Sequence, residues 1–330
     1  WYRMVGVAGT TQTAYSAVVE VVTPLSAPTL ATATQVANQL RVSLGWRQHT
    51  LAATGTEVQR STDNGSTWNT VAMPAGNAVG HLDTVTAGAT YLYRVRAFTP
   101  ATASDWATTT AVGPIVAPVA PTIASPASAT PSPVTGTTTV LTALGADLGG
   151  EGLLTYTWVA QGPLPGGLSF SASGTHAAGS TTVTFTAPGL YAFQVTITNP
   201  AGLSVMSTVN VTVVNTLSVI VTPAVTTVGP NRAVQVSAAV VNQFGTNQNL
   251  PVVLATSAGT IDTAGVLVPP TTPGTVTLTG TAGSLIGTAA VVVQGLPTPA
   301  AWFRLDETSG TAVADASGNG LTGTVSGTTS

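Results

Sequence analysis

The sequence contains no cysteine and no lysine, and each absence narrows what the protein can be. Without cysteine there is no disulfide, no thiolate ligand for a metal, no cysteine nucleophile and no thiol-linked haem. Without lysine there is no Lys–Asn isopeptide crosslink, and eight arginines supply all the basic charge. Because the formal net charge is −3 at pH 7, we expect no nucleic-acid partner.

Charged residues of either sign are also scarce, at 6% of the chain, against about 25% in an average soluble protein. No apolar run approaches the ~20 residues that a membrane-spanning helix needs, so we expect no membrane insertion within this chain. The chain is 44% hydrophobic and can therefore fill cores. Its solvent face must consist largely of Thr, Ser, Asn, Gln and Gly, which suggests a protein that acts anchored, glycosylated or assembled.

The stretch 88–97 has the period-2 pattern of a strand with one face in a core and the other in water. The alternating residues are Tyr91, Tyr93 and Val95 on one face and Leu92, Arg94 and Arg96 on the other. The first six residues align with residues 92–97 at an offset of 91, and the same offset carries Tyr15 onto Trp106. This internal repeat has about the length of one small β-sandwich, so it predicts an array of modules.

Residues 27–114 form the first complete predicted module. Trp46, the segment 57–61 and the segment 90–97 resemble a bacterial fibronectin type III domain. The resemblance implies that Trp46 lies in the core on an early strand. It also implies that Tyr91 is a tyrosine-corner residue whose hydroxyl bonds to nearby backbone.

Two further complete modules follow. Residues 115–214, which open on a Pro-rich linker over 115–133, are similar to PKD-like and related immunoglobulin-like repeats. The segments that carry this similarity are 154–158, 184–185, 189–191, 195–197 and 199–202. Residues 215–296 resemble bacterial immunoglobulin-like (Big) repeats through the segments 242–245, 259–262 and 265–267.

Both ends carry partial modules. Residues 1–26, with strands expected at 2–8 and 17–22, are interpreted as the C-terminal hairpin of a truncated fibronectin type III module. Residues 297–330 resemble the start of a laminin-G/concanavalin-like domain through the motifs at 301–307 and 315–320. The fold class expected is all-β, with tandem immunoglobulin-like and fibronectin type III β-sandwiches in an extended array.

No group of residues predicts catalysis, a cofactor or a metal site. The three histidines, His49, His81 and His176, fall in predicted loops and lack the spacing of metal ligands. Asp306 and Glu307 are adjacent on a predicted strand, so they point to opposite faces and form no glycosidase pair. The segment 315–320 lacks the acidic run of an EF-hand loop and more often forms a tight turn. We therefore expect a protein that is not an enzyme.

The aromatic residues give the remaining candidate sites. Four of them, Trp46, Tyr91, Trp158 and Tyr191, are predicted to be structural core residues. Trp68 and Trp106 are the candidates for surface platforms that stack on sugar rings, with ordinary packing as the alternative.

Two functional hypotheses follow. The first is a structural or adhesive segment of a secreted or cell-surface bacterial protein, acting as stalk, matrix or extracellular filament component. The second is an accessory carbohydrate-binding region of an exported polysaccharide-active enzyme whose catalytic domain lies outside this chain. The partners expected are other surface proteins, a polysaccharide, or further copies of the chain joined through unpaired strands at its ends.

Overall fold

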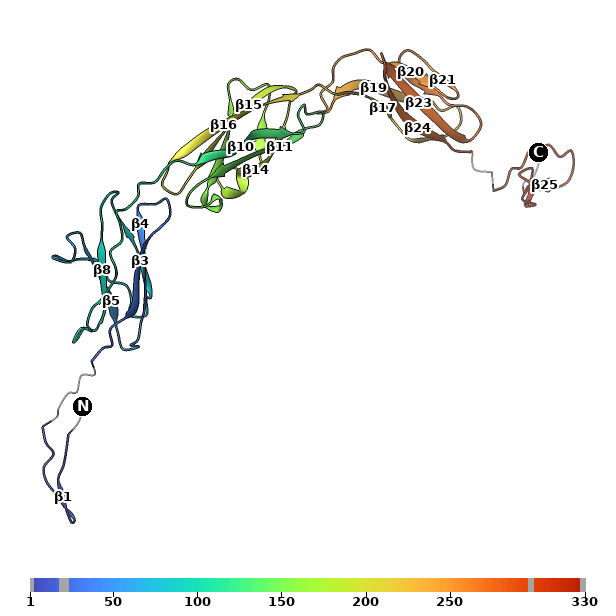
Figure 1. The fold of residues 1–330 in the computed structure, drawn as a ribbon. Helices are drawn as coiled ribbons and strands as arrows, with labels where there is room; N and C mark the ends of the chain where they lie inside the picture. Colours follow the sequence, from blue (N-terminus) through green and yellow to red (C-terminus); the bar gives the residue numbers. More distant parts are fainter. Residues whose placement is uncertain (1–2, 18–23, 296–299, 327–330) are drawn as a thin grey trace. The chain divides into compact units, whose positions relative to one another are not determined.

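The computed structural model describes residues 3–17, 24–295 and 300–326. The chain is almost entirely β and folds into tandem β-sandwiches, which confirms the expected fold class (Figure 1). Its internal contacts divide it into two compact units. The first unit is Trp1–Pro133, Thr138–Phe185 and Leu190–Thr212, and the second is Val134–Thr137, Thr186–Gly189 and Val213–Ser330. No helix within the described ranges is long and apolar enough to cross a membrane.

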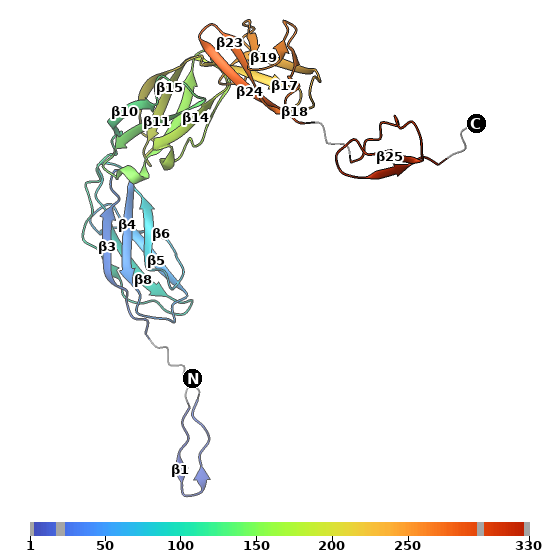
Figure 2. The same cartoon turned by 90° about the vertical axis from the view of Figure 1, so that its right-hand side faces the viewer.

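The first sandwich packs a three-stranded sheet against a four-stranded one (Figure 2). The three-stranded sheet has the order β3 (Thr29–Gln35), β4 (Arg41–Arg47) and β7 (Gly80–Thr84). The four-stranded sheet has the order β6 (Asn69–Ala72), β5 (Gly55–Ser61), β8 (Leu92–Phe98) and β9 (Ala107–Thr108). All the strand pairs in these two sheets are antiparallel.

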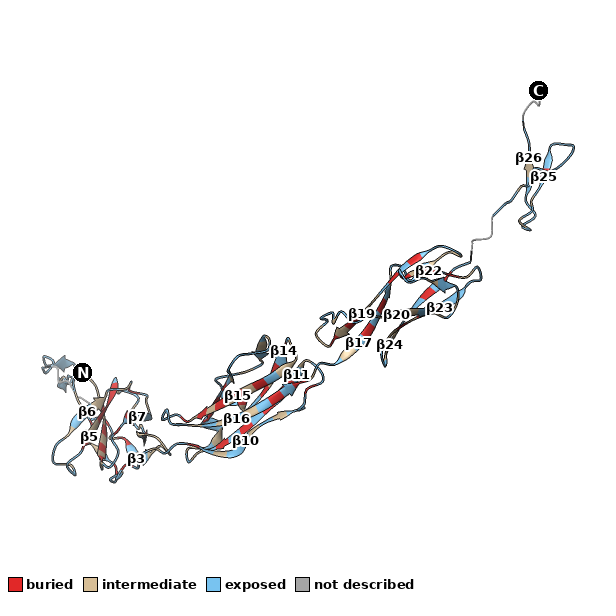
Figure 3. Ribbon diagram, turned by 90° about the horizontal axis from the view of Figure 1, so that it is seen from above, coloured by how far each residue is buried: buried red, intermediate tan, exposed pale blue. Residues whose placement is uncertain are grey.

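Alternate side chains along the strands fill the core of the first sandwich. In β4 and β8 every second residue is buried, and Val58 of β5 lies opposite Val95 of β8. The buried cluster consists of Val42, Leu44, Trp46, Val58, Val85, Tyr91, Tyr93, Val95 and Ile115. Figure 3 shows the buried positions in red along the strands. Between β5 and β6 the chain turns through Asn64 and Gly65, whose φ angles of 54° and 90° suit Asn and Gly.

The second sandwich has sheets of four and three strands. The first sheet has the order β10 (Thr122–Thr130), β11 (Thr138–Ala146), β14 (Ser180–Phe185) and β13 (Leu168–Phe170). The second has the order β12 (Thr155–Gln161), β15 (Gly189–Thr198) and β16 (Ser204–Val213). Five buried aromatic residues contribute to its interior, and the rings of two of them, Phe185 and Tyr191, have centroids 4.6 Å apart.

The third sandwich has two four-stranded sheets and an aliphatic core. One sheet has the order β17 (Leu217–Pro223), β19 (Val234–Asn242), β22 (Val266–Val268) and β21 (Thr260–Ile261). The other has the order β18 (Thr227–Val228), β24 (Leu285–Val293), β23 (Gly274–Ala282) and β20 (Val253–Thr256), with β18 parallel to β24. Gly287 of β24 lies so close to β17 that a Cβ there would collide with the carbonyl of Val219. Only glycine therefore allows β24 and β17 to approach this closely.

Short hairpins lie at both ends of the described chain. β1 (Val7–Ala8) pairs with β2 (Thr11–Gln12), so the second strand begins earlier than the predicted 17–22, which apart from Ala17 lies outside the described residues. Gly9, with φ of 61°, allows this shorter turn. Near the C-terminus β25 (Ala312–Ala314) pairs with β26 (Thr322–Thr324). The predicted strand at 301–307 was wrong, because only Phe303 forms a bridge, to Asp315.

The segment expected to link the first two sandwiches is more ordered than predicted. Ile115 is 2% exposed and belongs to the first core, so that sandwich extends past residue 114. β10 then occupies much of the remaining predicted linker. The sequence analysis also missed the strands β3, β7, β11, β13, β18, β21 and β22.

An ion pair joins the two sheets inside the first sandwich. Arg60 Nη1 of β5 lies 2.9 Å from Asp83 Oδ2 of β7, and the Tyr93 hydroxyl donates to the same oxygen at 2.8 Å. Burial, and then the hydrogen bond to Asp83, raise the pKa of Tyr93, so it stays a neutral donor. Nearby, the Tyr91 hydroxyl accepts from the Thr86 N–H at 3.0 Å, which is the contact that the tyrosine-corner resemblance implies.

Removing the charge of Asp83 should destabilise the first sandwich. In Asp83→Asn, Arg60 keeps its charge between the sheets without a counter-ion. Breaking a fully buried pair costs about 3–5 kcal/mol. The Arg60 side chain is 29% exposed, so we expect a loss of about 2 kcal/mol in the free energy of unfolding. Urea unfolding followed by tryptophan fluorescence measures it, with exposed Asp105→Asn as the control. Equal midpoints for the two variants would contradict the role of this ion pair.

Candidate functional site

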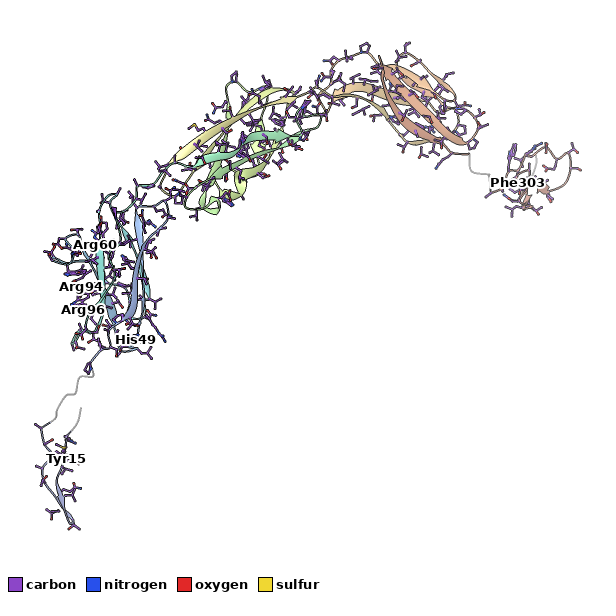
Figure 4. The ribbon with its side chains drawn as sticks, in the orientation of Figure 1. Tyr15, His49, Arg60, Arg94, Arg96 and Phe303 are labelled. Carbon is purple, nitrogen blue, oxygen red and sulfur yellow. The ribbon has the colours of Figure 1, made fainter. Side chains whose placement is uncertain are left out.

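A stack of cations and aromatic rings crosses the outer face of the β6-β5-β8-β9 sheet. The Arg94 guanidinium lies 4.3 Å from the ring centroid of Trp68 and 4.2 Å from that of Trp106. The Arg96 guanidinium lies 4.4 Å from the Trp106 ring. We call Trp68, Arg94, Trp106 and Arg96 the arginine–tryptophan ladder. Figure 4 shows Arg94 and Arg96 one after the other along this sheet.

Strand register brings the ladder together. Because Tyr93 and Val95 face the core, Arg94 and Arg96 must face outward from β8. Arg94 lies opposite Gln59 of β5 on one side and Thr108 of β9 on the other. The two tryptophans lie immediately before β6 and β9. The ladder therefore depends on residues from separate parts of the sequence that only the sheet makes neighbours.

The two arginines of the ladder have different partners. Arg96 pairs with Glu57, its Nη2 lying 2.7 Å from Oε2. Arg94 instead donates from Nε and Nη2 to the neutral Oε1 of Gln59, at 2.8 and 2.6 Å. Within the described residues it forms no ion pair. Burial, and then the charge of Arg96, lower the pKa of Arg94, although Glu57 partly offsets this.

Glu57, the carboxylate that pairs with Arg96, is only 7% exposed. Burial alone would raise its pKa. Hydrogen bonds from Thr70, Arg96 and Gln59 outweigh burial and hold the pKa of Glu57 below its usual value. Glu57 is therefore a buried anion whose negative charge is compensated mainly by Arg96.

The N-terminal hairpin repeats part of this surface. The Arg3 guanidinium lies 4.1 Å from the Tyr15 ring centroid, and the offset of 91 carries this pair onto Arg94 and Trp106. The hydrogen bonds repeat as well. Thr13 N–H donates to Gly6 O as Ser104 N–H does to Ala97 O, both at 2.9 Å. The Thr13 and Ser104 hydroxyls then accept from Gly6 N and Ala97 N. The repeat seen in the sequence is therefore also a repeat of contacts.

The predicted site residues fall into two groups. The predicted core residues, Trp46, Tyr91, Trp158 and Tyr191, are all buried, and Trp158 Nε1 donates to Ala178 O at 2.8 Å. The predicted sugar platforms, Trp68 and Trp106, are half-buried and engaged by arginine. The sequence analysis missed the role of Arg94 and Arg96. The available signal was two outward arginines on one strand of a chain that has only eight.

The other candidates stay apart from the ladder. Within residues 3–17, 24–295 and 300–326 no three His, Asp or Glu side chains gather to hold a metal ion. His81 lies on β7 rather than in a predicted loop, and His176 begins a short 3₁₀ turn. The carboxylate of Asp315 accepts from the Ser317 hydroxyl and from the N–H groups of Trp302, Ser317 and Leu321. The segment 315–320 is therefore a tight turn closed by its own donors.

A cavity of about 430 Å³ opens beside His49, at one end of the first sandwich. The Nε2 of Gln48 donates to the Thr56 hydroxyl and to Gly76 O, whereas its buried Oε1 has no hydrogen-bond partner. His49 Nε2 lies 2.5 Å from Thr29 Oγ1. The cavity is therefore lined by a histidine that already bonds to Thr29, and the unpartnered oxygen of Gln48 is buried rather than exposed to it.

Part of the chain matches a known sequence family. Residues 113–214 match the family described as "Putative Ig domain". The matched range contains the second sandwich, to which it assigns an immunoglobulin-type domain. No curated protein sequence matches the chain.

Solved structures similar to the chain include single modules and arrays. An Fn3-like protein from Clostridium thermocellum is 25% identical, over 26% of this chain and 91% of that one, with a TM-score of 0.24. Drosophila N-cadherin EC1-4 is 15% identical, over 82% and 74%, with a TM-score of 0.29. The D00-D0 domain of intimin is 16% identical, over 53% and 99%, with a TM-score of 0.28.

The carboxylate of Glu57 should make the first sandwich sensitive to acid. Because its folded pKa is below its unfolded value, its ionised form stabilises the fold above the unfolded pKa of about 4.3. That stability is lost as the pH falls through the folded pKa. We expect Glu57→Gln to lower the free energy of unfolding by about 1–2 kcal/mol at pH 7, and by progressively less below about pH 4.3.

Urea unfolding of the wild type and of Glu57→Gln at pH 7, 5, 4 and 3 measures this difference. The companion variant Thr70→Val keeps the carboxylate but removes one of its hydrogen bonds, and should show a smaller loss. If Glu57→Gln lowers the free energy of unfolding by the same amount at every pH from 7 to 3, the ionised carboxylate of Glu57 is not what stabilises the fold.

Proposed function

We propose that the chain is a non-enzymatic structural region of an extracellular protein, in which tandem sandwiches hold other parts of the molecule at a set separation. A bacterial cell-surface or secreted protein is the setting that fits its composition best. Such a region would act as a stalk, as part of an extracellular matrix, or as part of an extracellular filament. The observation that carries the proposal is the way in which side-chain amides hold the segment that joins the first two sandwiches.

Two amides of the first sandwich bind this segment as a neighbouring strand would. Gln35 Nε2 donates to Val116 O at 2.7 Å, and its Oε1 accepts from Val116 N at 2.9 Å. Asn38 does the same at Val119, with distances of 3.0 and 2.7 Å. Each side chain thus satisfies both backbone groups of one residue. We call these contacts the amide clips.

The second sandwich completes the same network within the first compact unit. Asn38 Nδ2 also donates to Asp147 Oδ1 at 2.7 Å. Asn199, which is only 4% exposed, donates to that oxygen at 3.0 Å and to Val119 O at 2.9 Å. Residues of both sandwiches therefore meet on one joining segment. A connected polar network of this kind restricts the angle between the modules.

A related contact, in which one side-chain amide bonds to backbone groups of two residues, occurs in the second compact unit. Gln243, in the turn after β19, donates from Nε2 to Val214 O at 2.5 Å and accepts from Thr216 N–H at 2.9 Å. The segment that enters the third sandwich is thus also held by a side-chain amide. Side-chain amides that hold both segments favour a chain in which fixed module spacing matters.

The finer assignments from the sequence belong to this proposal. They are a PKD-like second sandwich, a Big-type third sandwich, a laminin-G-like start at residue 297 and a partial fibronectin type III module over 1–26. Self-association through strands at the ends, or contact with other surface proteins, would supply the partners of a stalk or filament. The arginine–tryptophan ladder favours a second candidate function, an accessory carbohydrate-binding region of an exported polysaccharide-active enzyme.

Loss of the Asn38 amide should loosen the junction of the first two sandwiches. Asn38 has φ of 53°, so Asn38→Gly removes the amide without backbone strain. Because the chain has no cysteine, Ser43→Cys and Ser169→Cys give two unique, exposed positions for spin labels. Double electron–electron resonance should give a narrow distance distribution for the parent chain. In Asn38→Gly we expect a distribution at least about twice as wide.

Asn210→Ala is the matched control, because Asn210 is an exposed amide on β16. It should leave the distribution unchanged. A distribution that is already broad in the parent chain, or that stays narrow in Asn38→Gly, would count against the amide clips as the element that sets module spacing.

A further inference from the structure

The ladder holds one cation that the protein leaves without a carboxylate. Arg60 and Arg96 each have an acidic partner, whereas Arg94 bonds only to a neutral amide. No hydrogen bond to a described residue uses its Nη1, and its Cζ lies over the rings of Trp68 and Trp106. A guanidinium with N–H groups that make no bond within the protein can bind a planar carboxylate.

We propose that Arg94, stacked on Trp68 and Trp106, binds carboxylate groups of an acidic polysaccharide, and that Arg3 beside Tyr15 repeats this site in the preceding module. The inference goes beyond the structural role proposed above and deepens the second candidate function, because it names the class of polysaccharide and the residue that selects it. It also changes the part expected of the tryptophans. They hold the arginine in place, and the arginine, rather than an exposed ring face, selects the ligand.

The repetition of the site favours a polymer as the ligand. The Arg–aromatic pair and its hydrogen bonds recur at the module repeat of 91 residues. Arg3, like Arg94, has no acidic partner within the described ranges. Weak sites repeated along a chain act together on a partner that repeats the same anionic group. A polysaccharide of uronic acids has this property.

The surroundings of Arg94 suit sugar hydroxyls. Thr70 and Thr108 are exposed on the strands that flank β5 and β8. They belong to the cross-strand row Thr70, Gln59, Arg94 and Thr108. The Thr108 hydroxyl can donate to and accept from a sugar while the guanidinium holds the sugar's carboxylate, whereas the Thr70 hydroxyl already donates to Glu57.

Binding of the whole chain to polygalacturonate tests the proposal, with calorimetry at low salt as the measurement. Arg94→Gln should weaken binding at least about tenfold, as expected for the loss of a charge-assisted hydrogen bond. Arg41→Gln, on β4 of the opposite sheet, removes the same charge and should change the affinity less than about twofold. Neutral dextran should not bind.

Thr108→Glu is the second variant, in case Arg94→Gln unfolds the sheet. Thr108 is exposed and lies opposite Arg94, so a glutamate there can pair with the guanidinium and occupy the site without removing the ladder. It should weaken polygalacturonate binding as much as Arg94→Gln does, with an unchanged melting temperature.

Four results would overturn the proposal. They are an absence of polygalacturonate binding, an equal loss in Arg41→Gln, equal binding of dextran, and binding of poly-L-glutamate as tight as that of polygalacturonate. The last result would point to an acidic protein as the partner. None of these results depends on the spin-label distances at the junction, so the two proposals fail independently.

Discussion

Burial of alternate side chains between two sheets is the constraint on which every sandwich of this chain depends. In β11 each inward residue is buried and each outward residue is exposed, and β8 and β15 place large aromatic or aliphatic side chains inward in the same way. The outward positions must then keep the protein in solution with very few charges. Threonine meets this need, because its hydroxyl faces water while its branched carbon suits an extended backbone.

Charge is concentrated where the sheets need polar contacts. The first sandwich contains both Arg–carboxylate pairs of the described residues, one between the sheets and one on the outer face. The second sandwich relies on an aromatic interior and the third on an aliphatic one. Similar β architectures are thus stabilised by three kinds of interior. The surface that carries the most distinctive chemistry belongs to the sandwich with the most charge.

The parts of the fold that could be predicted are those that local sequence determines. Alternation over 91–97 predicts β8 and its two faces. The strands β7 and β18 were missed because they are short and gain stability only from their neighbours. The arginine–tryptophan ladder could not be predicted either, because it too depends on neighbouring strands. Trp68 and Trp106 meet at Arg94 through cross-strand pairing, which no local pattern reveals.

The aliphatic interior of the third sandwich has a consequence for spectroscopy. Between residues 215 and 296 the only aromatic residue is Phe244, so this module contains neither tryptophan nor tyrosine. Tryptophan and tyrosine fluorescence, and the near-ultraviolet circular dichroism bands of those two residue types, therefore report on the other modules alone. A single smooth transition seen by those methods would say nothing about whether the third sandwich had unfolded. Only a backbone signal, such as far-ultraviolet dichroism or amide exchange, follows all three sandwiches together.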